Sequence, residues 1–147
     1  MALQTGTTAP NFTLPSTNGT DFVLANNLGK PLVLFFYPKD FTPGCTAEAC
    51  DFRDNMSVFS DLEVLVIGIS RDTIATHNKF RAEHKLPYHL LSDVSGKVSA
   101  LYDAKIPVLG LSKRITYLVN AEGKIDAAFS DMFDAKAHIK NMLKALK

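Results

Sequence analysis

Two cysteines, Cys45 and Cys50, offer the clearest chemistry in this sequence of 147 residues. Cys45 follows Thr42 and Pro43, which predict a helix start with Thr42 as N-cap and Pro43 as the first helical residue. Unpaired backbone N–H groups and the positive end of the helix dipole favour an anion in the first turn. Cys45 is therefore expected to exist partly as a thiolate, the nucleophilic form of cysteine.

The spacing of the two cysteines favours a reactive pair over a static disulfide. In an unbroken helix, residues five apart have Cα atoms about 8–9 Å from each other. A disulfide requires roughly 4.4–6.8 Å between Cα atoms. Cys45 and Cys50 can therefore bond only if the helix between them partly unwinds, which suits an attacking thiolate and a latent resolving thiol.

The two cysteines have two other possible roles. Free cysteines are often simply small buried apolar residues, although the proline-framed helix start argues against that here. A zinc site is disfavoured because there are only two thiols, more widely spaced than usual, and because the four histidines form no companion pair. These histidines are His77, His84, His89 and His138. His77 and His84 lie seven apart on a predicted helix and are expected to be solvated, and no metal or other cofactor is expected.

Strand and helix patterns alternate along the chain. Residues 31–37 and 63–70 are apolar runs typical of buried strands, and residues 43–58 form the predicted cysteine helix. The N-terminal residues around Phe12 and Phe22 suggest a hairpin. The remaining expectations are a helix over 72–85 capped by Asp72, a strand over 88–91, a helix over 95–102, a hairpin over 115–119 and 124–129, and an amphipathic helix from Asp134.

This order predicts an α/β fold with a central mixed sheet flanked by helices, in one domain over residues 1–147. The formal net charge is +1, with no block of like charges, so neither nucleic acid nor an anionic membrane is an expected partner. No apolar run is long enough for a membrane span, and no signal peptide is recognised. The cytoplasm is the expected location, where paired cysteines are usually catalytic or redox-sensing.

The cysteine segment resembles the peroxiredoxins. The spacing of Pro38, Thr42 and Cys45 matches that family's active-site pattern, and the stretch after it is similar to the bacterioferritin comigratory protein branch, also called peroxiredoxin Q. The similarity spans nearly the whole chain. Its further motifs are Glu48, Cys50 and 52–54 in the cysteine helix, 9–12 near the start, 70–72 after a strand, His77 and Phe80, 91–93, and 114–120.

The resemblance implies a thioredoxin-like fold with an N-terminal hairpin extension, and a thiol peroxidase acting on hydrogen peroxide and organic hydroperoxides. Cys45 would attack the peroxide and become a sulfenic acid, and Cys50 would resolve it as an intramolecular disulfide. Thioredoxin, or alternatively glutaredoxin, would reduce that disulfide. Because resolution is intramolecular, a monomer is expected.

The other site residues have expected roles around the sulfur. Thr42 would orient the peroxide and hydrogen-bond the thiolate, and the Gly44 and Cys45 N–H groups would hold the other oxygen. Pro38 and Pro43 would shield the thiolate from water. Arg114, which matches the family's catalytic arginine, would stabilise the thiolate, and Glu48 would fix that guanidinium by a bidentate contact.

The competing functions are a thiol–disulfide oxidoreductase, which typically has Cys-X-X-Cys, and a redox-sensing protein without fast peroxide turnover. The sequence departs from the family at Asp103, where a glycine commonly follows the tyrosine. This leaves the 103–113 loop and the preferred hydroperoxide open. Residues 108–111 are candidates for the substrate mouth, for a dimer contact, or for a loop folded onto the core.

Overall fold

A five-stranded mixed sheet forms the centre of the computed structural model, which describes residues 2–106 and 111–146. The central strand β3 (Leu32–Phe36) pairs in parallel with β4 (Leu65–Ser70) and antiparallel with β8 (Ile115–Val119). The outer strands are β5 (His89–Ser92), parallel to β4, and β9 (Ile125–Ser130), antiparallel to β8. All residues of β3 and β8 are buried, as their apolar sequences predict for strands covered on both faces.

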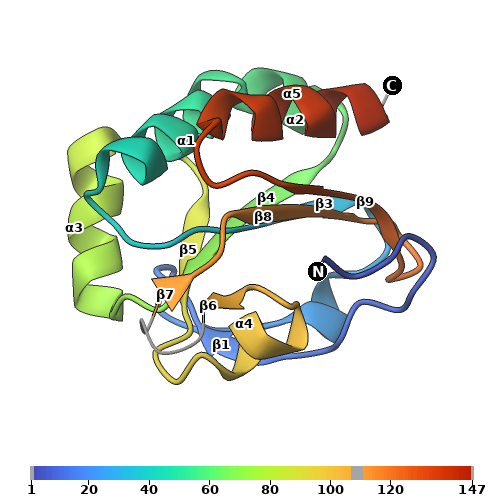
Figure 1. The fold of residues 1–147 in the computed structure, drawn as a ribbon, viewed down its shortest axis with the longest axis horizontal. Coiled ribbons are helices and arrows are strands. Elements are labelled where there is room, and N and C mark those ends of the chain that lie inside the picture. The colour runs from blue at the N-terminus through green and yellow to red at the C-terminus, as the bar shows by residue number, and fades with distance from the viewer. Residues whose placement is uncertain (1, 107–110, 147) are drawn as a thin grey trace.

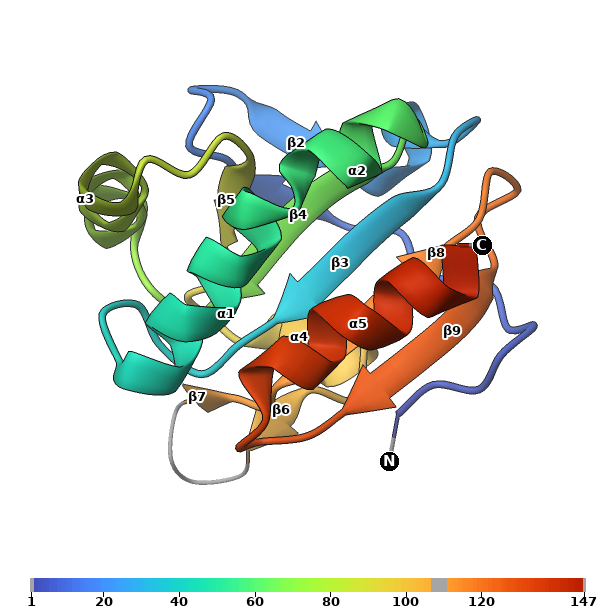
Figure 2. The same cartoon turned by 90° about the horizontal axis from the view of Figure 1, so that it is seen from above.

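One face of the sheet is covered by α1 (Pro43–Asp54), α2 (Met56–Asp61) and α5 (Ala135–Leu146), as Figures 1 and 2 show. The core on this face is aromatic, with the rings of Phe35 in β3 and Phe52 in α1 stacked at a centroid distance of 4.5 Å. This stacking fixes α1, and so the cysteine pair, against the central strand.

The opposite face is covered by the N-terminal hairpin of β1 (Thr13–Pro15) and β2 (Asp21–Val23), the 3-10 turn η1 (Leu24–Asn27) and α4 (Lys97–Leu101). Helix α3 (Ile74–His84) lies beside β5 at the edge of the sheet (Figure 2). A two-stranded ribbon of β6 (Lys105–Ile106) and β7 (Leu111–Ser112) precedes β8. The fold is thus α/β with a mixed sheet and an N-terminal hairpin, as the sequence predicts.

The pairing of β3 with β8 brings the site residues together. Because the two strands are antiparallel, Ile115 at the start of β8 lies opposite Phe36 at the end of β3. The chain leaves β3 at this point to reach Cys45, and Arg114 immediately precedes β8. Two residues 69 positions apart in the sequence therefore meet at the carboxyl end of the central strand.

Two predictions about helices are wrong. The helix expected over 43–58 is broken at Asn55, where φ is −107° and ψ is 9°, and whose side chain donates to the carbonyl of Asp51. The N-cap of α3 is Thr73, whose hydroxyl accepts from the Thr76 N–H. The predicted cap, Asp72, instead accepts from the Asp40 N–H and from the Ser70 hydroxyl.

His77 is a third correction, because this histidine is fully buried rather than solvated. Its Nδ1 lies 2.6 Å from the Asp40 carboxylate and its Nε2 lies 2.9 Å from the Leu91 carbonyl oxygen. The Tyr37 hydroxyl also donates to Asp40, at 2.5 Å. Buried polar groups need such partners, and those of His77 come from two other segments of the chain.

Asp103, the departure from the family pattern, has φ of +53°, a left-handed conformation that glycine adopts most easily. This explains why a glycine suits the position. Of residues 108–111, only Leu111 lies within the described part of the chain, in β7, so the predicted roles of 108–110 concern residues outside it. Among the described residues, no helix is long and apolar enough to cross a membrane.

Candidate active site

Cys45 lies in the first turn of α1, as the sequence predicts. Thr42 is in the extended N-cap conformation and Pro43 is the first helical residue. The Cys45 side chain is buried, with 1% of its surface exposed, and its thiol is free. No described residue accepts a hydrogen bond from the Gly44 or Cys45 N–H, so both donors remain available to a ligand at the helix start.

Arg114 supplies the cation at this sulfur. Its Nη2 donates to Sγ of Cys45 at 3.4 Å, and the arginine is itself only 4% exposed. The guanidinium is held from two further directions: Nη1 donates to Oε1 of Glu48 at 2.7 Å, and Nε donates to the Met132 carbonyl at 3.2 Å. A buried, fully anchored guanidinium beside a thiol favours the thiolate.

Gly44 allows this approach, since a Cβ at that position would lie 3.0 Å from Nη2 of Arg114. The guanidinium therefore occupies space that a side chain at position 44 would need.

Glu48 contacts Arg114 through one oxygen only, so the predicted bidentate contact is wrong in that detail. Its other oxygen, Oε2, makes no hydrogen bond to a described residue and lies 3.5 Å from Nδ1 of His138. Burial raises the pKa of Glu48 to about 8, although Arg114 opposes the shift. Burial and Arg114 thus act on Glu48 in opposite directions, and the same guanidinium contacts both its carboxyl and Sγ of Cys45.

Arg114 keeps its charge in this environment. Burial lowers its pKa, but the neighbouring charges of Glu48 and Cys45 outweigh that effect and raise it. The cation is permanent at any pH at which the fold persists.

Thr42 differs from its predicted contact. Its hydroxyl donates to the Lys39 carbonyl at 2.7 Å, and no hydrogen bond joins it to Sγ of Cys45 in the described residues. Pro38 is half-buried, whereas Pro43 and Gly44 are exposed at the mouth of the site. The Thr42 hydroxyl is thus engaged by its own loop, and the shielding roles of Pro38 and Pro43 stay predictions.

Cys50 lies in the same unbroken helix as Cys45, half-buried and free. The intact helix separates the two thiols, in agreement with the spacing argument. Two contacts hold this part of α1 to the α3 side of the molecule: the Tyr88 hydroxyl donates to the Ala49 carbonyl at 2.7 Å, and Arg53 donates to the His84 carbonyl at 2.7 Å. A disulfide between the two cysteines requires this segment to unwind.

The site combines a thiol at a helix start, a buried arginine on its sulfur and a second thiol five residues later. The AhpC/TSA family model matches residues 5–128. The chain belongs to this family. Within it, the chain is 37% identical over 153 aligned positions to "Peroxiredoxin Bcp" of Bacillus subtilis, covering 100% of this chain and 97% of the relative.

Other members show the same likeness. "Peroxiredoxin Q, chloroplastic" of rice is 40% identical over 143 residues, which cover 97% of this chain but only 66% of the rice protein. This AhpC/TSA chain thus spans less than two thirds of its rice relative. Among solved structures, peroxidoxin BcpB of Mycobacterium tuberculosis superposes with a TM-score of 0.92 at 38% identity, covering 98% of this chain and 96% of that one. Peroxiredoxin Q of Xanthomonas campestris gives 0.84 at 30% identity, covering 92% and 89%.

Sequence reasoning missed two buried polar groups. His138 is fully buried next to Glu48, and Asp40 is buried within the loop between β3 and α1, where it contacts Tyr37 and His77. Ligand atoms of Asp40, Asp72 and His77 lie within 4.8 Å of one another, but hydrogen bonds within this group and to its surroundings already occupy them. No local sequence pattern predicts that these side chains are buried, because their hydrogen-bond partners lie on other helices and strands.

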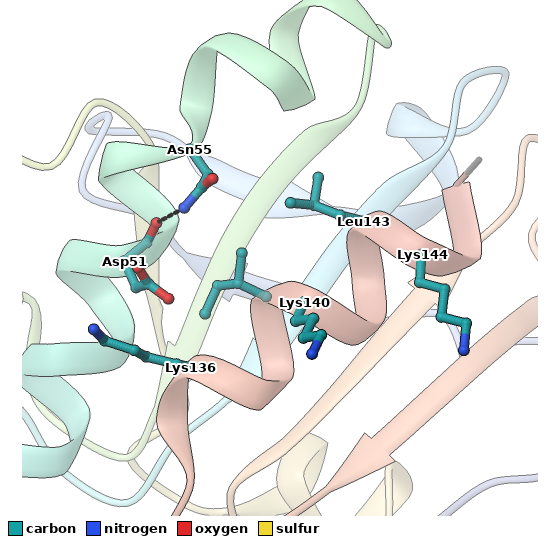
Figure 3. Close-up of a pocket in the computed structure, with 7 residues that line it drawn as sticks. Asp51, Asn55, Lys136, Lys140, Leu143 and Lys144 are labelled. Atoms are coloured by element: carbon teal, nitrogen blue, oxygen red, sulfur yellow. Dashed lines mark hydrogen bonds between the residues drawn. The ribbon is translucent and has the colours of Figure 1, made fainter.

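A hollow between α1 and α5 is separate from the cysteine chemistry. Figure 3 shows Asp51 of α1 and Asn55 just after it across from α5, with the side chain of Lys136 reaching toward Asp51. The other lining residues are on α5: Ile139, Lys140, Leu143 and Lys144. Neither Cys45 nor Arg114 lines it, so the reacting sulfur lies outside this pocket.

Proposed function

We propose that this protein is a thiol peroxidase that reduces hydrogen peroxide and organic hydroperoxides. The observation that carries the proposal is the Arg114 guanidinium, fixed 3.4 Å from Sγ of Cys45 at the start of α1. The names of its relatives support it, and one Xanthomonas campestris structure is described by its alkyl peroxide reduction activity.

The first step is attack of the Cys45 thiolate on the terminal oxygen of the hydroperoxide. The S–O bond forms as the O–O bond breaks, which gives Cys45 sulfenic acid and an alkoxide or hydroxide that takes a proton to leave as alcohol or water. Arg114 stabilises the sulfur charge as it moves onto the leaving oxygen, and the free N–H groups of Gly44 and Cys45 are placed to hold the peroxide.

In the second step, the thiol of Cys50 attacks the sulfenic sulfur and releases water. The disulfide that forms requires α1 to unwind between the two residues, so the oxidised and reduced forms differ in structure. A dithiol protein of the thioredoxin type then restores both thiols by exchange, and glutaredoxin is the alternative reductant.

The proposal extends to the oligomeric state and the location of the protein. Intramolecular resolution needs no second subunit, so we propose a monomer consisting of one domain. A cycle that depends on a dithiol reductant fits a reducing compartment such as the cytoplasm. Sedimentation at micromolar concentration tests the monomer.

The experiment for the function is steady-state consumption of hydrogen peroxide with thioredoxin, thioredoxin reductase and NADPH. We expect turnover by the native protein and none by Cys45→Ser. Equal turnover by the two proteins would contradict the proposal, whereas a protein that is oxidised once and not recycled would be a redox sensor.

A further inference from the structure

His138 of α5 is buried against the groups that hold Arg114, yet it touches neither the sulfur nor the guanidinium. Its Nε2 lies 2.8 Å from the Asp131 carbonyl oxygen, and its Nδ1 lies 2.7 Å from Oγ1 of Thr116 in β8 and 3.5 Å from Oε2 of Glu48. The ring of Phe129 packs on it edge-on at a centroid distance of 4.8 Å. One imidazole therefore joins α1, β8 and the segment between β9 and α5.

The contacts of the ring fix its tautomer. A carbonyl oxygen only accepts, so Nε2 carries a proton and donates it to Asp131. In the neutral ring Nδ1 is then an acceptor, facing the Thr116 hydroxyl and Oε2 of Glu48. Burial lowers the pKa of His138, although the Asp131 carbonyl opposes this, and the direction agrees with a neutral ring. The Thr116 hydroxyl donates to Nδ1, and Oε2 of Glu48 lies 3.5 Å from Nδ1 without a hydrogen bond to a described residue.

Both groups that anchor the Arg114 guanidinium are in turn next to His138 or to a residue that His138 contacts. The first is Glu48, whose Oε1 accepts from Nη1 and whose Oε2 faces His138. The second is the peptide segment after β9, where Asp131 accepts from His138 and the next carbonyl, that of Met132, accepts from Nε of Arg114. The Asp131 N–H also donates to the Arg114 carbonyl at 3.3 Å.

We propose that His138 is a positioning residue for Arg114, acting through Glu48 and through the Asp131–Met132 segment to keep the guanidinium on the sulfur of Cys45. The proposal rests on the peroxidase function for its significance, but its geometry concerns only the reduced protein. The charged or titratable groups that act on His138 are Glu48 from α1, Arg114 before β8, and Asp131 and Asp134 from the segment before α5.

The test measures the ionisation of Cys45 without peroxide. In a Cys50→Ser background, alkylation of Cys45 by iodoacetamide is followed by intact mass across pH, and the midpoint of the rate profile reports thiolate formation. We expect His138→Phe to raise this midpoint by about one pH unit, because the sulfur loses a well-placed opposite charge. His138→Gln, whose amide nitrogen can reach the Asp131 carbonyl, is expected to recover at least half of that shift.

The control is His89→Phe, which replaces another histidine, one whose Nδ1 contacts Thr17 at 2.9 Å on the far strand β5. Its midpoint is expected to match that of the parent. If the His138→Phe protein does not fold, His138→Asn replaces it, since the shorter amide cannot reach Asp131.

A folded His138→Phe protein with the parental midpoint would overturn the proposal. Equal shifts of the midpoint for the Phe and Gln variants would also overturn it, because the hydrogen bond to the Asp131 carbonyl would then have no effect on Cys45. The peroxidase proposal can fail separately, since a midpoint that depends on His138 can be found in a protein with no peroxide turnover.

Discussion

Replacing Arg114 with methionine removes the positive charge at Cys45 while keeping an unbranched side chain in its place. Nη2 lies 3.4 Å from Sγ, and two unit charges at that separation attract by about 5 kcal/mol at an effective dielectric constant of about 20. That energy corresponds to a shift of about 3.6 pH units as an upper limit. Rearrangement of the surrounding dipoles reduces it, so we expect the ionisation midpoint of Cys45 to rise by about 1–3 pH units.

The assay is alkylation of Cys45 across pH in a Cys50→Ser background, with the peroxide oxidation rate measured by rapid quench at pH 7. At pH 7 the oxidation rate should fall about tenfold for each pH unit by which the new midpoint lies above 7. Arg71→Met is the matched control, because Arg71 is a half-buried arginine that donates to the Val94 carbonyl, away from the sulfur. A folded Arg114→Met protein with an unchanged midpoint would refute the electrostatic argument.

Three further substitutions test other parts of the site. Cys50→Ser should consume about one equivalent of peroxide and stop as Cys45 sulfenic acid, detected by intact mass; sustained turnover with thioredoxin would contradict the resolving role. Glu48→Gln should flatten the pH dependence of the free energy of unfolding, measured with urea. In the native protein the pKa of Glu48 is about 8, whereas the unfolded chain loses this proton near pH 4.5, so stability falls as the pH rises between these values. An equal slope in the variant would contradict this. Tyr88→Phe removes the hydrogen bond to the Ala49 carbonyl, which is worth about 1 kcal/mol, and should speed formation of the Cys45–Cys50 disulfide up to about fivefold in a quenched time course. Slower or unchanged disulfide formation would show that this bond does not restrain the unwinding of α1.

Much of the site could be predicted because its determinants are local. Thr42 and Pro43 set the helix start in front of Cys45, and the five-residue spacing to Cys50 fixes two separated thiols in one helix. Arg114 could be predicted only through its match to the family's catalytic arginine. The structure supplies the physical reason, because antiparallel pairing of β8 with β3 brings the residue before β8 to the end of β3 that leads to Cys45.

The contacts that the sequence did not predict involve polar groups paired over long distances. His77 was expected in solvent, but Asp40, 37 residues away, gives it a buried partner. His138 lies on the inward face of the amphipathic helix α5, where the apolar residues Ile139 and Met142 determine the sequence pattern. Its partner Glu48 lies 90 positions earlier in the sequence, so no local pattern predicts the contact. The break at Asn55 contains neither glycine nor proline, and depends on a side-chain bond to the Asp51 carbonyl.

The most direct test of the central claim is the rate at which fully reduced protein reacts with one equivalent of hydrogen peroxide, followed by thiol alkylation and intact mass. We predict oxidation orders of magnitude faster than that of a free thiol, with Cys45 and Cys50 lost together to one intramolecular disulfide. Oxidation no faster than that of free cysteine would show that Arg114 and the start of α1 do not activate Cys45 toward peroxide, and would contradict the assignment.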